Sequence, residues 1–342
     1  MGNGAAPAAR IGPGLWSIPV PIPDNPLGFT LVYLLESTAG PVLVDAGWDH
    51  PASWRALTDG VRSAGAAITD VYGVLVTHHH PDHVGLAPRV RAESGAWIAL
   101  HPEDAAVLRR QRDEEPADGG RRLDRMLTVL RAAGAPPDEI AALRARDGWR
   151  PREPAAPDRE LADGQLADVP GRRVRALWTP GHSPGHTCFY LEGERRLLSG
   201  DHLLPSITPH IALFDGEPGD PLADFLGSLG KLAALDVDEV LPAHEYRFTG
   251  AGQRAEEIAA HHHDRLREVV AALSPATPTL WEITRRMRWN QPWEEMTVMS
   301  HRMALAEAAA HLRYLQRRDR VRVTGDGWPV RYERVPDPSG QP

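Results

Sequence analysis

The 342-residue chain contains a single cysteine, Cys188, and a single lysine, Lys231, among its 38 basic residues. One cysteine excludes an intramolecular disulfide, so nothing in the composition requires an oxidising compartment. No apolar run is long enough to span a bilayer, and the first residues, MGNGAAPAARIGPGLW, lack the apolar segment of a secretion signal. We therefore expect a cytoplasmic protein without membrane association.

Basic residues are fewer than acidic ones, and the formal net charge is −8. This balance argues against attraction of the whole protein to nucleic acid or to an anionic membrane. The near-absence of lysine, together with 31 glycines and 32 prolines, indicates the codon usage of a GC-rich genome. The length allows one large domain and a smaller one.

Strand and helix patterns alternate over the first hundred residues, which is typical of an α/β fold. Charged helices separated by Gly and Pro are then expected over 102–160. The expected strands lie within 15–48 and at 71–76, 96–100, 172–181, 187–193, 195–201 and 238–245. The expected helices of this part lie at 51–66, near 85–95 and at 221–235.

From about residue 253 the pattern changes to three helices followed by a hairpin around Gly325, an order typical of a winged helix. The first of these helices carries the run His261-His262-His263. Successive side chains of a helix point about 100° apart, so these rings cannot converge on one ion. We expect them at a surface or an interface.

The stretch VTHHHPDHVG, residues 76–85, follows an apolar strand and concentrates histidines in one loop. In extended backbone His78 and His80 point the same way, which leaves His79 as a spacer. Asp82 and His83 follow where the chain turns into a helix. Imidazole and carboxylate groups in this arrangement suit Zn²⁺ and also Fe or Mn.

Three later stretches offer further ligands. His186 lies in WTPGHSPGHT, Asp201 in LLSGDHLL and His244 in VLPAHEY. Each follows a predicted strand, and open α/β sheets place their sites at such carboxyl ends. His182, in the first half of PGHSPGH, is interpreted as a structural turn residue.

The ordered series T-H-x-H-x-D-H at 77–83, the later His, Asp and His, and VLVDAG with Asp45 together resemble the metallo-β-lactamase superfamily over roughly residues 15–250. The resemblance implies an αββα sandwich, which is an α/β fold, as a catalytic domain at 1–252. Within it, 102–160 would be a helical insertion and a possible cap. A winged-helix-like domain would follow at 253–342.

The same resemblance implies two divalent metal ions, with zinc the first candidate. It assigns His78, His80 and His186 to one ion, Asp82, His83 and His244 to the other, and Asp201 to a position bridging both. Asp45 would orient a ligand histidine. His202, next to the bridging residue, and His210, in a nearby loop, are candidates for supporting or substrate contacts.

Two divalent ions about 3.5–4 Å apart can share a water and lower its pKa toward about 7, and the hydroxide then attacks carbon or phosphorus. Asp82 would also orient this hydroxide. The commonest true β-lactamases have cysteine where this chain has Asp201, whereas a carboxylate resembles the glyoxalase II, lactonase and RNase Z branches. We expect a hydrolase of a small acyl substrate, with a thioester ahead of a lactone.

Two other functions stay open. The subgroup with a C-terminal winged helix includes mitochondrial endoribonucleases as well as fungal polyketide thioesterases, so a metal-dependent endoribonuclease or phosphodiesterase is the first alternative. The second is a winged-helix DNA-binding protein with a vestigial site. Residues 261–342 carry thirteen arginines against ten acidic residues, and the helix near 297–317 has no basic stripe. We therefore do not expect a nucleic-acid partner and interpret the tail as a packing or homodimer element.

Overall fold

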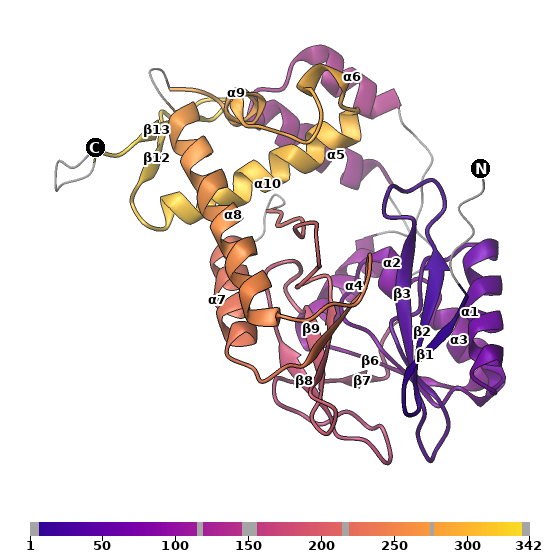
Figure 1. The fold of residues 1–342 in the computed structure, drawn as a ribbon. Coiled ribbons are helices and arrows are strands. Elements are labelled where there is room, and N and C mark those ends of the chain that lie inside the picture. Colours follow the sequence, from indigo (N-terminus) through magenta and orange to yellow (C-terminus); the bar gives the residue numbers. More distant parts are fainter. Residues whose placement is uncertain (1–6, 115–118, 146–155, 214–218, 274–276, 337–342) are drawn as a thin grey trace. The chain divides into compact units, whose positions relative to one another are not determined.

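The computed structural model describes the chain except for residues 1–6, 115–118, 146–155, 214–218, 274–276 and 337–342 (Figure 1). The contacts divide it into two units. The first unit comprises Met1–Glu114, Arg150–Pro209 and Ser228–Ala255. The second comprises Glu115–Trp149, His210–Gly227 and Glu256–Pro342.

A seven-stranded mixed sheet forms one layer of the first unit, with its strands in chain order from β1 to β7. The strands up to β4 pair antiparallel, and those from β4 to β7 pair parallel. Parallel neighbours need a crossover, and helices provide it here. The strands are β1 (Ala9–Gly12), β2 (Leu15–Pro21), β3 (Phe29–Leu35), β4 (Val42–Val44), β5 (Gly73–Leu75), β6 (Trp97–Leu100) and β7 (Arg159–Glu160).

A second sheet of four strands has the order β11-β10-β9-β8. Only the pair β10 and β11 is parallel, because the chain between them passes through helix α7 (Pro221–Ala233). The strands are β8 (Val174–Trp178), β9 (Thr187–Leu191), β10 (Arg196–Gly200) and β11 (Glu239–Pro242).

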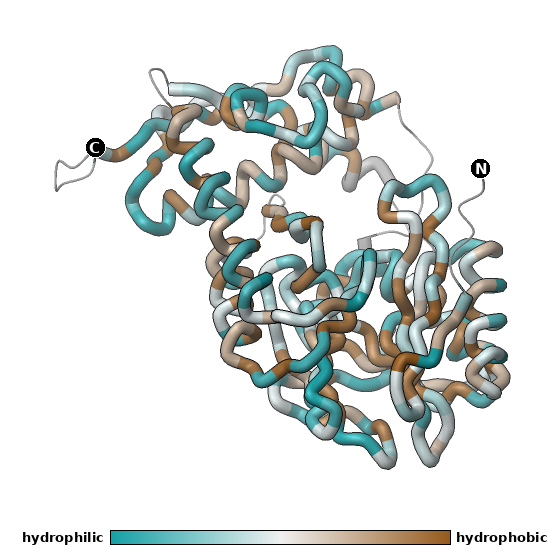
Figure 2. The backbone as a smooth tube through the Cα atoms, in the orientation of Figure 1, coloured by the Kyte–Doolittle hydropathy of each residue, from teal (hydrophilic) through white to brown (hydrophobic). Residues whose placement is uncertain are grey.

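One hydrophobic core is shared by the two sheets. Tyr33 and Val44 of the first sheet belong to the same buried cluster as Phe189 and Leu198 of the second. Strand β3, FTLVYLL, is buried at all but its first position, which explains its nearly continuous apolar sequence. Figure 2 shows hydrophobic segments gathered in the strands of this unit.

Helices cover the outer faces of the sheets. On the first sheet, α1 (Pro51–Ser63), α3 (Ala87–Ser94) and α4 (Pro102–Glu114) contribute buried residues to a second cluster with the strands. On the second sheet, Ser228 Oγ of α7 donates a hydrogen bond to Pro180 O, and Lys231 lies over the Trp178 ring. These layers confirm the expected α/β sandwich. The helix expected near 85–95 is α3, and the short helix α2 (Pro81–Val84) precedes it, where the chain was expected to turn into a helix at Asp82 and His83.

The second unit is mainly helical and ends in a hairpin. Its helix α9 begins at a capping box, in which Thr279 and Glu282 exchange hydrogen bonds with each other's backbone N–H groups. The contacts group α5 and α6 with the C-terminal helices, whereas α4 belongs to the first unit. Its remaining elements include α5 (Gly119–Ala133), α6 (Pro137–Ala145), most of α8 (Ala251–Ala272), α9 (Leu280–Arg286), α10 (Val298–Gln316), β12 (Val321–Thr324) and β13 (Arg331–Arg334).

The prediction that His262 lies at a surface is wrong. Its side chain is buried, and its Nδ1 lies 3.2 Å from Nε2 of His311 on α10. The physical reason is that His262 occupies the apolar face of α8, where Phe225 also contacts it. None of the helices in the described ranges is both long and apolar enough to cross a membrane.

Candidate metal centre

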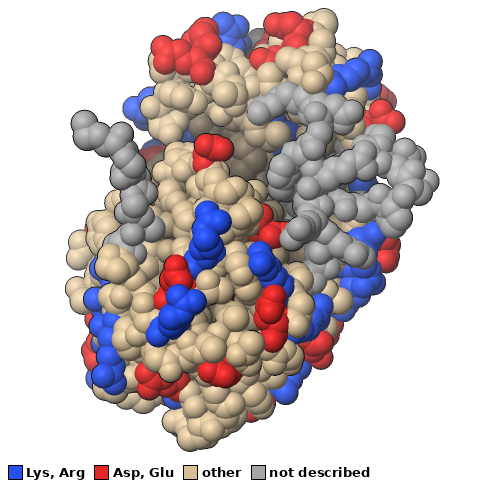
Figure 3. Space-filling model, turned by 90° about the vertical axis from the view of Figure 1, so that its right-hand side faces the viewer, with Lys and Arg blue, Asp and Glu red and all other residues tan. Residues whose placement is uncertain are grey.

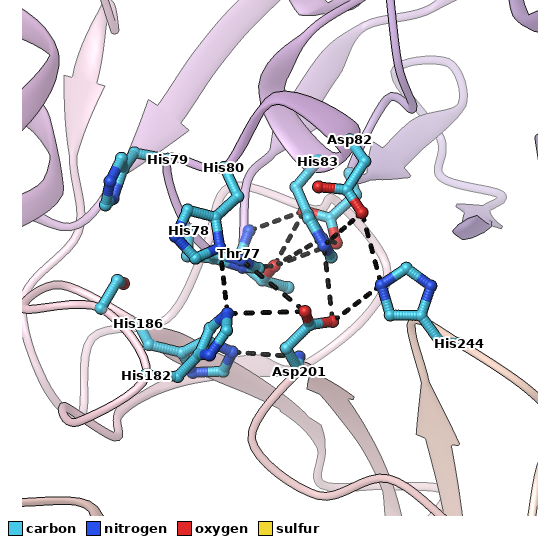
Figure 4. A network of polar contacts seen from close by, with 12 residues as sticks. Thr77, His78, His79, His80, Asp82, His83, His182, His186, Asp201 and His244 are labelled. Atoms are coloured by element: carbon cyan, nitrogen blue, oxygen red, sulfur yellow. Dashed lines mark hydrogen bonds and ion pairs between the residues drawn. The ribbon is translucent and has the colours of Figure 1, made fainter. Parts of the chain in front are cut away.

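Four segments of the first unit bring histidines and carboxylates to one place (Figure 4). The loop after β5 carries His78 and His80, and the first turn of α2 carries Asp82 and His83. The other segments contribute one residue each: the loop after β8 contributes His182, the end of β10 is followed by Asp201, and β11 is followed by His244.

The first group consists of three imidazole nitrogens. Nδ1 of His80 lies 2.9 Å from Nε2 of His78 and 3.0 Å from Nε2 of His182. The three atoms are close enough together to hold one metal ion. Neutral imidazole nitrogens are ligands for zinc and for other first-row transition metals.

The second group combines a carboxylate with two imidazoles. Oδ2 of Asp82 lies 3.5 Å from Nε2 of His83 and 3.4 Å from Nε2 of His244. These atoms are also close enough together to hold one ion.

Asp201 lies between the two groups. Its Oδ2 is 3.5 Å from Nε2 of His182 and 4.0 Å from Nε2 of His78. Its Oδ1 is 3.4 Å from Nε2 of His83 and 3.2 Å from Nε2 of His244. One carboxylate therefore faces both groups, one oxygen toward each.

The far sides of the rings are anchored by the protein. Nδ1 of His83 lies 2.8 Å from Oδ2 of Asp45, which is the contact that the family resemblance implies for Asp45. Nδ1 of His244 donates to Phe29 O at 3.0 Å. A ring whose Nδ1–H donates to oxygen presents its Nε2 lone pair to the centre.

The atoms that face the centre fit a cation. Nε2 of His83, Nε2 of His244 and Oδ1 of Asp201 are buried and have no hydrogen-bond partner within the described part of the chain. Buried polar groups are normally satisfied, and leaving them without partners costs free energy. A metal ion satisfies lone pairs and negative charge that converge on one place with no hydrogen-bond donor between them. The ligand atoms present therefore fit two divalent ions.

The pKa values reflect the same crowding. Burial, reinforced by neighbouring rings, lowers the pKa of His78 and of His80 well below its ordinary value, so both are neutral ligands near pH 7. Burial also opposes protonation of His244, but the charge of Asp201 outweighs it and raises the pKa to about 10. Burial opposes ionisation of Asp82, yet the charge of His83 holds its pKa well below the usual range. An ion bound by the second group would take the place of the protons that the carboxylates otherwise favour on these rings.

His186 does not join the first group in the way the sequence suggested. Its Nδ1 lies 2.9 Å from Thr179 Oγ1, and its Nε2 accepts a hydrogen bond from the Asp201 N–H at 3.2 Å. Both ring nitrogens are therefore engaged by the protein. His182, interpreted from sequence as a turn residue, takes the place beside His80 instead.

His202 and His210 are the two candidates for supporting or substrate contacts. His202 is fully buried and packs on the ring of His186, so it supports the centre rather than reaching a substrate. His210 belongs to the second unit, where Nε2 lies 3.0 Å from Met303 O. The lone cysteine, Cys188, is buried in β9, and burial raises the pKa of its thiol to about 12, which makes it unsuitable as a nucleophile.

Sequence reasoning missed two groups that support the centre. Asp104, in the first turn of α4, accepts hydrogen bonds from the loops around His79 and Ser183. Glu245, next to His244, accepts from the backbone N–H groups of Ser206 and Ile207. An acidic residue in the first turn of a helix is common, so only the neighbour of a ligand, Glu245, offered a signal.

Comparison with known proteins identifies the family. The model of the metallo-beta-lactamase superfamily matches residues 25–244, which is more than half of the chain. The chain therefore belongs to the metallo-beta-lactamase superfamily. The crystal structure of a metallo-beta-lactamase family protein from Thermus thermophilus is similar with a TM-score of 0.78 and 35% sequence identity, and the match covers 95% of this chain and 100% of that one.

Two curated relatives are more distant. The lactamase-like protein vrtG of Penicillium aethiopicum is 25% identical over 245 residues, which is 72% of this chain and 61% of the fungal protein. The hydroxyacylglutathione hydrolase of Acidiphilium cryptum (strain JF-5) is 32% identical over 202 residues, which is 59% of this chain and 60% of that protein. The matched region thus spans about three fifths of the length of each of these two relatives.

Proposed function

We propose that the protein is a metal-dependent hydrolase of acyl substrates, with a thioester favoured over a lactone. The observation that carries the proposal is the position of Asp201, whose two oxygens face two separate groups of ligands. Membership of the metallo-beta-lactamase superfamily supports hydrolysis, and the hydroxyacylglutathione hydrolase relative supports an acyl substrate. We propose zinc for both ions.

The proposed ligand set differs from the sequence prediction at one position. His78, His80 and His182 would hold one ion, Asp82, His83 and His244 the other, and Asp201 both. Divalent ions bound there would supply a lowered water pKa and polarisation of a carbonyl oxygen.

The side chains have separate tasks in such a reaction. The carboxylate of Asp82 could also accept a hydrogen bond from the attacking water and orient it. Asp45 holds the His83 ring, and Phe29 O holds the His244 ring, so the donor geometry is fixed before a substrate binds. Pre-organisation of this kind lowers the cost of reaching the transition state.

Exposed apolar side chains near His244 support an acyl group as the substrate. Tyr246, 58% exposed, is two residues from His244, and Ile207 donates its N–H to Glu245 between them. Leu27, also exposed, precedes Phe29, whose carbonyl anchors His244. Exposed apolar side chains on neighbouring segments are suited to contact an alkyl chain.

The charge distribution gives less support to a nucleic-acid substrate. On the face in Figure 3, basic and acidic side chains are interspersed rather than gathered in a track. Next to the centre, Arg247 is paired with Glu239 and Arg254 donates to the carbonyl oxygens of Leu204 and Ile207. Binding of a polyanion depends on unpaired cations along its path.

The test is thiol release from a panel of acyl-CoA thioesters of increasing chain length, measured with the zinc-loaded protein. We expect turnover, with a preference for an apolar acyl group. Asp82→Asn, which removes the carboxylate charge and preserves the size of the side chain, should lower kcat by about 10²–10⁴-fold.

The same preparations are analysed for bound metal and for secondary structure by circular dichroism. Thiol release that persists at the original rate in Asp82→Asn would contradict the assigned role. A protein that binds two ions and releases no thiol from any member of the panel would overturn the thioester proposal. Lactones and then single-stranded RNA are the next substrates to try.

A further inference from the structure

Asp104 is a buried carboxylate that none of the metal-facing groups contains. It lies in the first turn of α4, and its side chain is fully buried. Its oxygens accept hydrogen bonds from the His79 N–H at 2.9 Å, from Ser183 Oγ at 2.8 Å and from the Gly185 N–H at 2.6 Å. The His79 ring adds Nδ1 at 3.1 Å.

These partners come from the two loops that present the first ligand group. His79 lies between His78 and His80 in sequence, and its ring points away from the cluster in Figure 4. Ser183 directly follows His182. The Asp104 carboxylate therefore connects the backbone of the loop that carries His78 and His80 to Ser183, which is next to His182 in the other loop.

The packing around Asp104 indicates a close fit between the loops and α4. A Cβ added at Gly185 would lie 2.4 Å from Asp104 N and 2.9 Å from Asp104 Cγ, so only glycine permits the approach. The carboxylate accepts from donors on both loops, and it needs no proton to do so. An asparagine at position 104 would direct its N–H₂ group, which only donates, at one of these donors, so one of the hydrogen bonds would be lost.

We propose that Asp104 is a positioning residue that sets the distance between the loops of His78, His80 and His182, and thereby the affinity of this group for a divalent ion. The proposal rests on the metal sites of the proposed function, but not on the substrate. Its counterpart is Asp45, which holds His83 directly and thus supports the second group. The two buried aspartates therefore support different halves of the centre.

The test compares Asp104→Asn with the original protein by titration of the metal-free chain with Co²⁺, whose absorption spectrum distinguishes a site with three nitrogen ligands from a site with two. We expect one of the two binding events to weaken by about 10–100-fold, and the other to keep its affinity and its spectrum. Asp158→Asn is the matched control, since Asp158 accepts from the Ile98 N–H and from Arg91 in the same unit and contacts neither loop.

Equal weakening of both events, or two unchanged events, would overturn the proposal. If Asp104→Asn fails to fold by circular dichroism, Ser183→Ala provides the second test, because it removes one donor and leaves the two backbone donors. It should weaken the same event by a smaller factor, and no change would again contradict the proposal. Failure of the thioester assay with normal Co²⁺ binding would refute the substrate and leave this inference standing.

Discussion

A histidine binds a cation through one ring nitrogen, and the partner of its other nitrogen fixes the ring, so both contacts decide its role. His186 uses both nitrogens within the protein, toward Thr179 and toward the backbone of Asp201. His182 instead directs Nε2 at His80 and at the Asp201 carboxylate. Two residues that look equivalent in PGHSPGH therefore have different tasks.

This difference leads to a prediction at the residue scale. We expect His182→Ala to lose one bound ion per chain and to lower turnover by at least about 100-fold. His186→Gln should keep both ions, and its free energy of unfolding should fall by about 1–3 kcal/mol, because a buried hydrogen-bonding group loses part of its partners. Metal analysis by mass spectrometry and denaturant unfolding measure the two effects. The reverse pattern, with metal lost only from the His186 variant, would restore the ligand set expected from sequence.

At the scale of elements, the end of β10 shows how a strand delivers a ligand. Gly200 closes the strand with a φ of 51°, which lies in the left-handed region, and Asp201 follows. A Cβ at this position would lie 2.7 Å from Nε2 of His186 and 2.9 Å from Cβ of Thr77. The turn into the centre thus requires glycine for its dihedral angles and for its space.

We therefore expect Gly200→Ala to lower the free energy of unfolding by roughly 2–4 kcal/mol, from left-handed strain and overpacking together. Gly193→Ala is the matched control, since a Cβ there meets no atom within 4 Å and its φ is not positive. Thermal and denaturant unfolding measure both variants. If the two variants have the same free energy of unfolding, the residues around position 200 accommodate the added Cβ without loss of stability, and the prediction is wrong.

The elements also show where local patterns stop being informative. The apolar runs predicted β2 to β6, β8 to β11 and the amphipathic helices α1 and α7, because burial on one or both faces is visible in the spacing. Strand β1, which is largely exposed, was not predicted. The two-residue strand β7 has no such pattern, since only its pairing with β6 defines it. The break between α2 and α3 depends on backbone contacts, including the Leu86 N–H donating to Gly47 O, which local spacing does not encode.

At the scale of the whole molecule, buried neutral histidines make stability depend on pH. His262 and His311 in the second unit are both buried, with Nδ1 of His262 3.2 Å from Nε2 of His311. Burial, aided by the charge of His311, lowers the pKa of His262 to about 2. The unfolded chain takes up this proton below about pH 6.5 and the folded chain does not, so stability falls as the pH falls below about 6.5.

We expect His262 alone to cost about 2 kcal/mol of folding free energy at pH 5 relative to pH 7.5. Urea unfolding of the whole protein at the two pH values measures the loss of folding free energy. The variant His262→Gln isolates the contribution of His262, because the glutamine amide does not titrate. The slope with pH should be smaller in this variant. An identical slope in the two proteins would place the titrating groups elsewhere.

The local sequence determined the strand and helix pattern and the ligand loop at 76–85. In this loop the backbone is extended at His78 and His80 and helical at Asp82 and His83. These local conformations set the directions of the four side chains, so the residues next to them in sequence suffice to predict those directions. Tertiary structure alone decided between His182 and His186 and gave Asp104 its partners. The contact of His182 with His80 and those of Asp104 with Ser183 and Gly185 join residues between 79 and 102 positions apart. The bond of Asp104 with the His79 N–H spans 25 positions, and only the packing of α4 against the two loops brings all of these residues together.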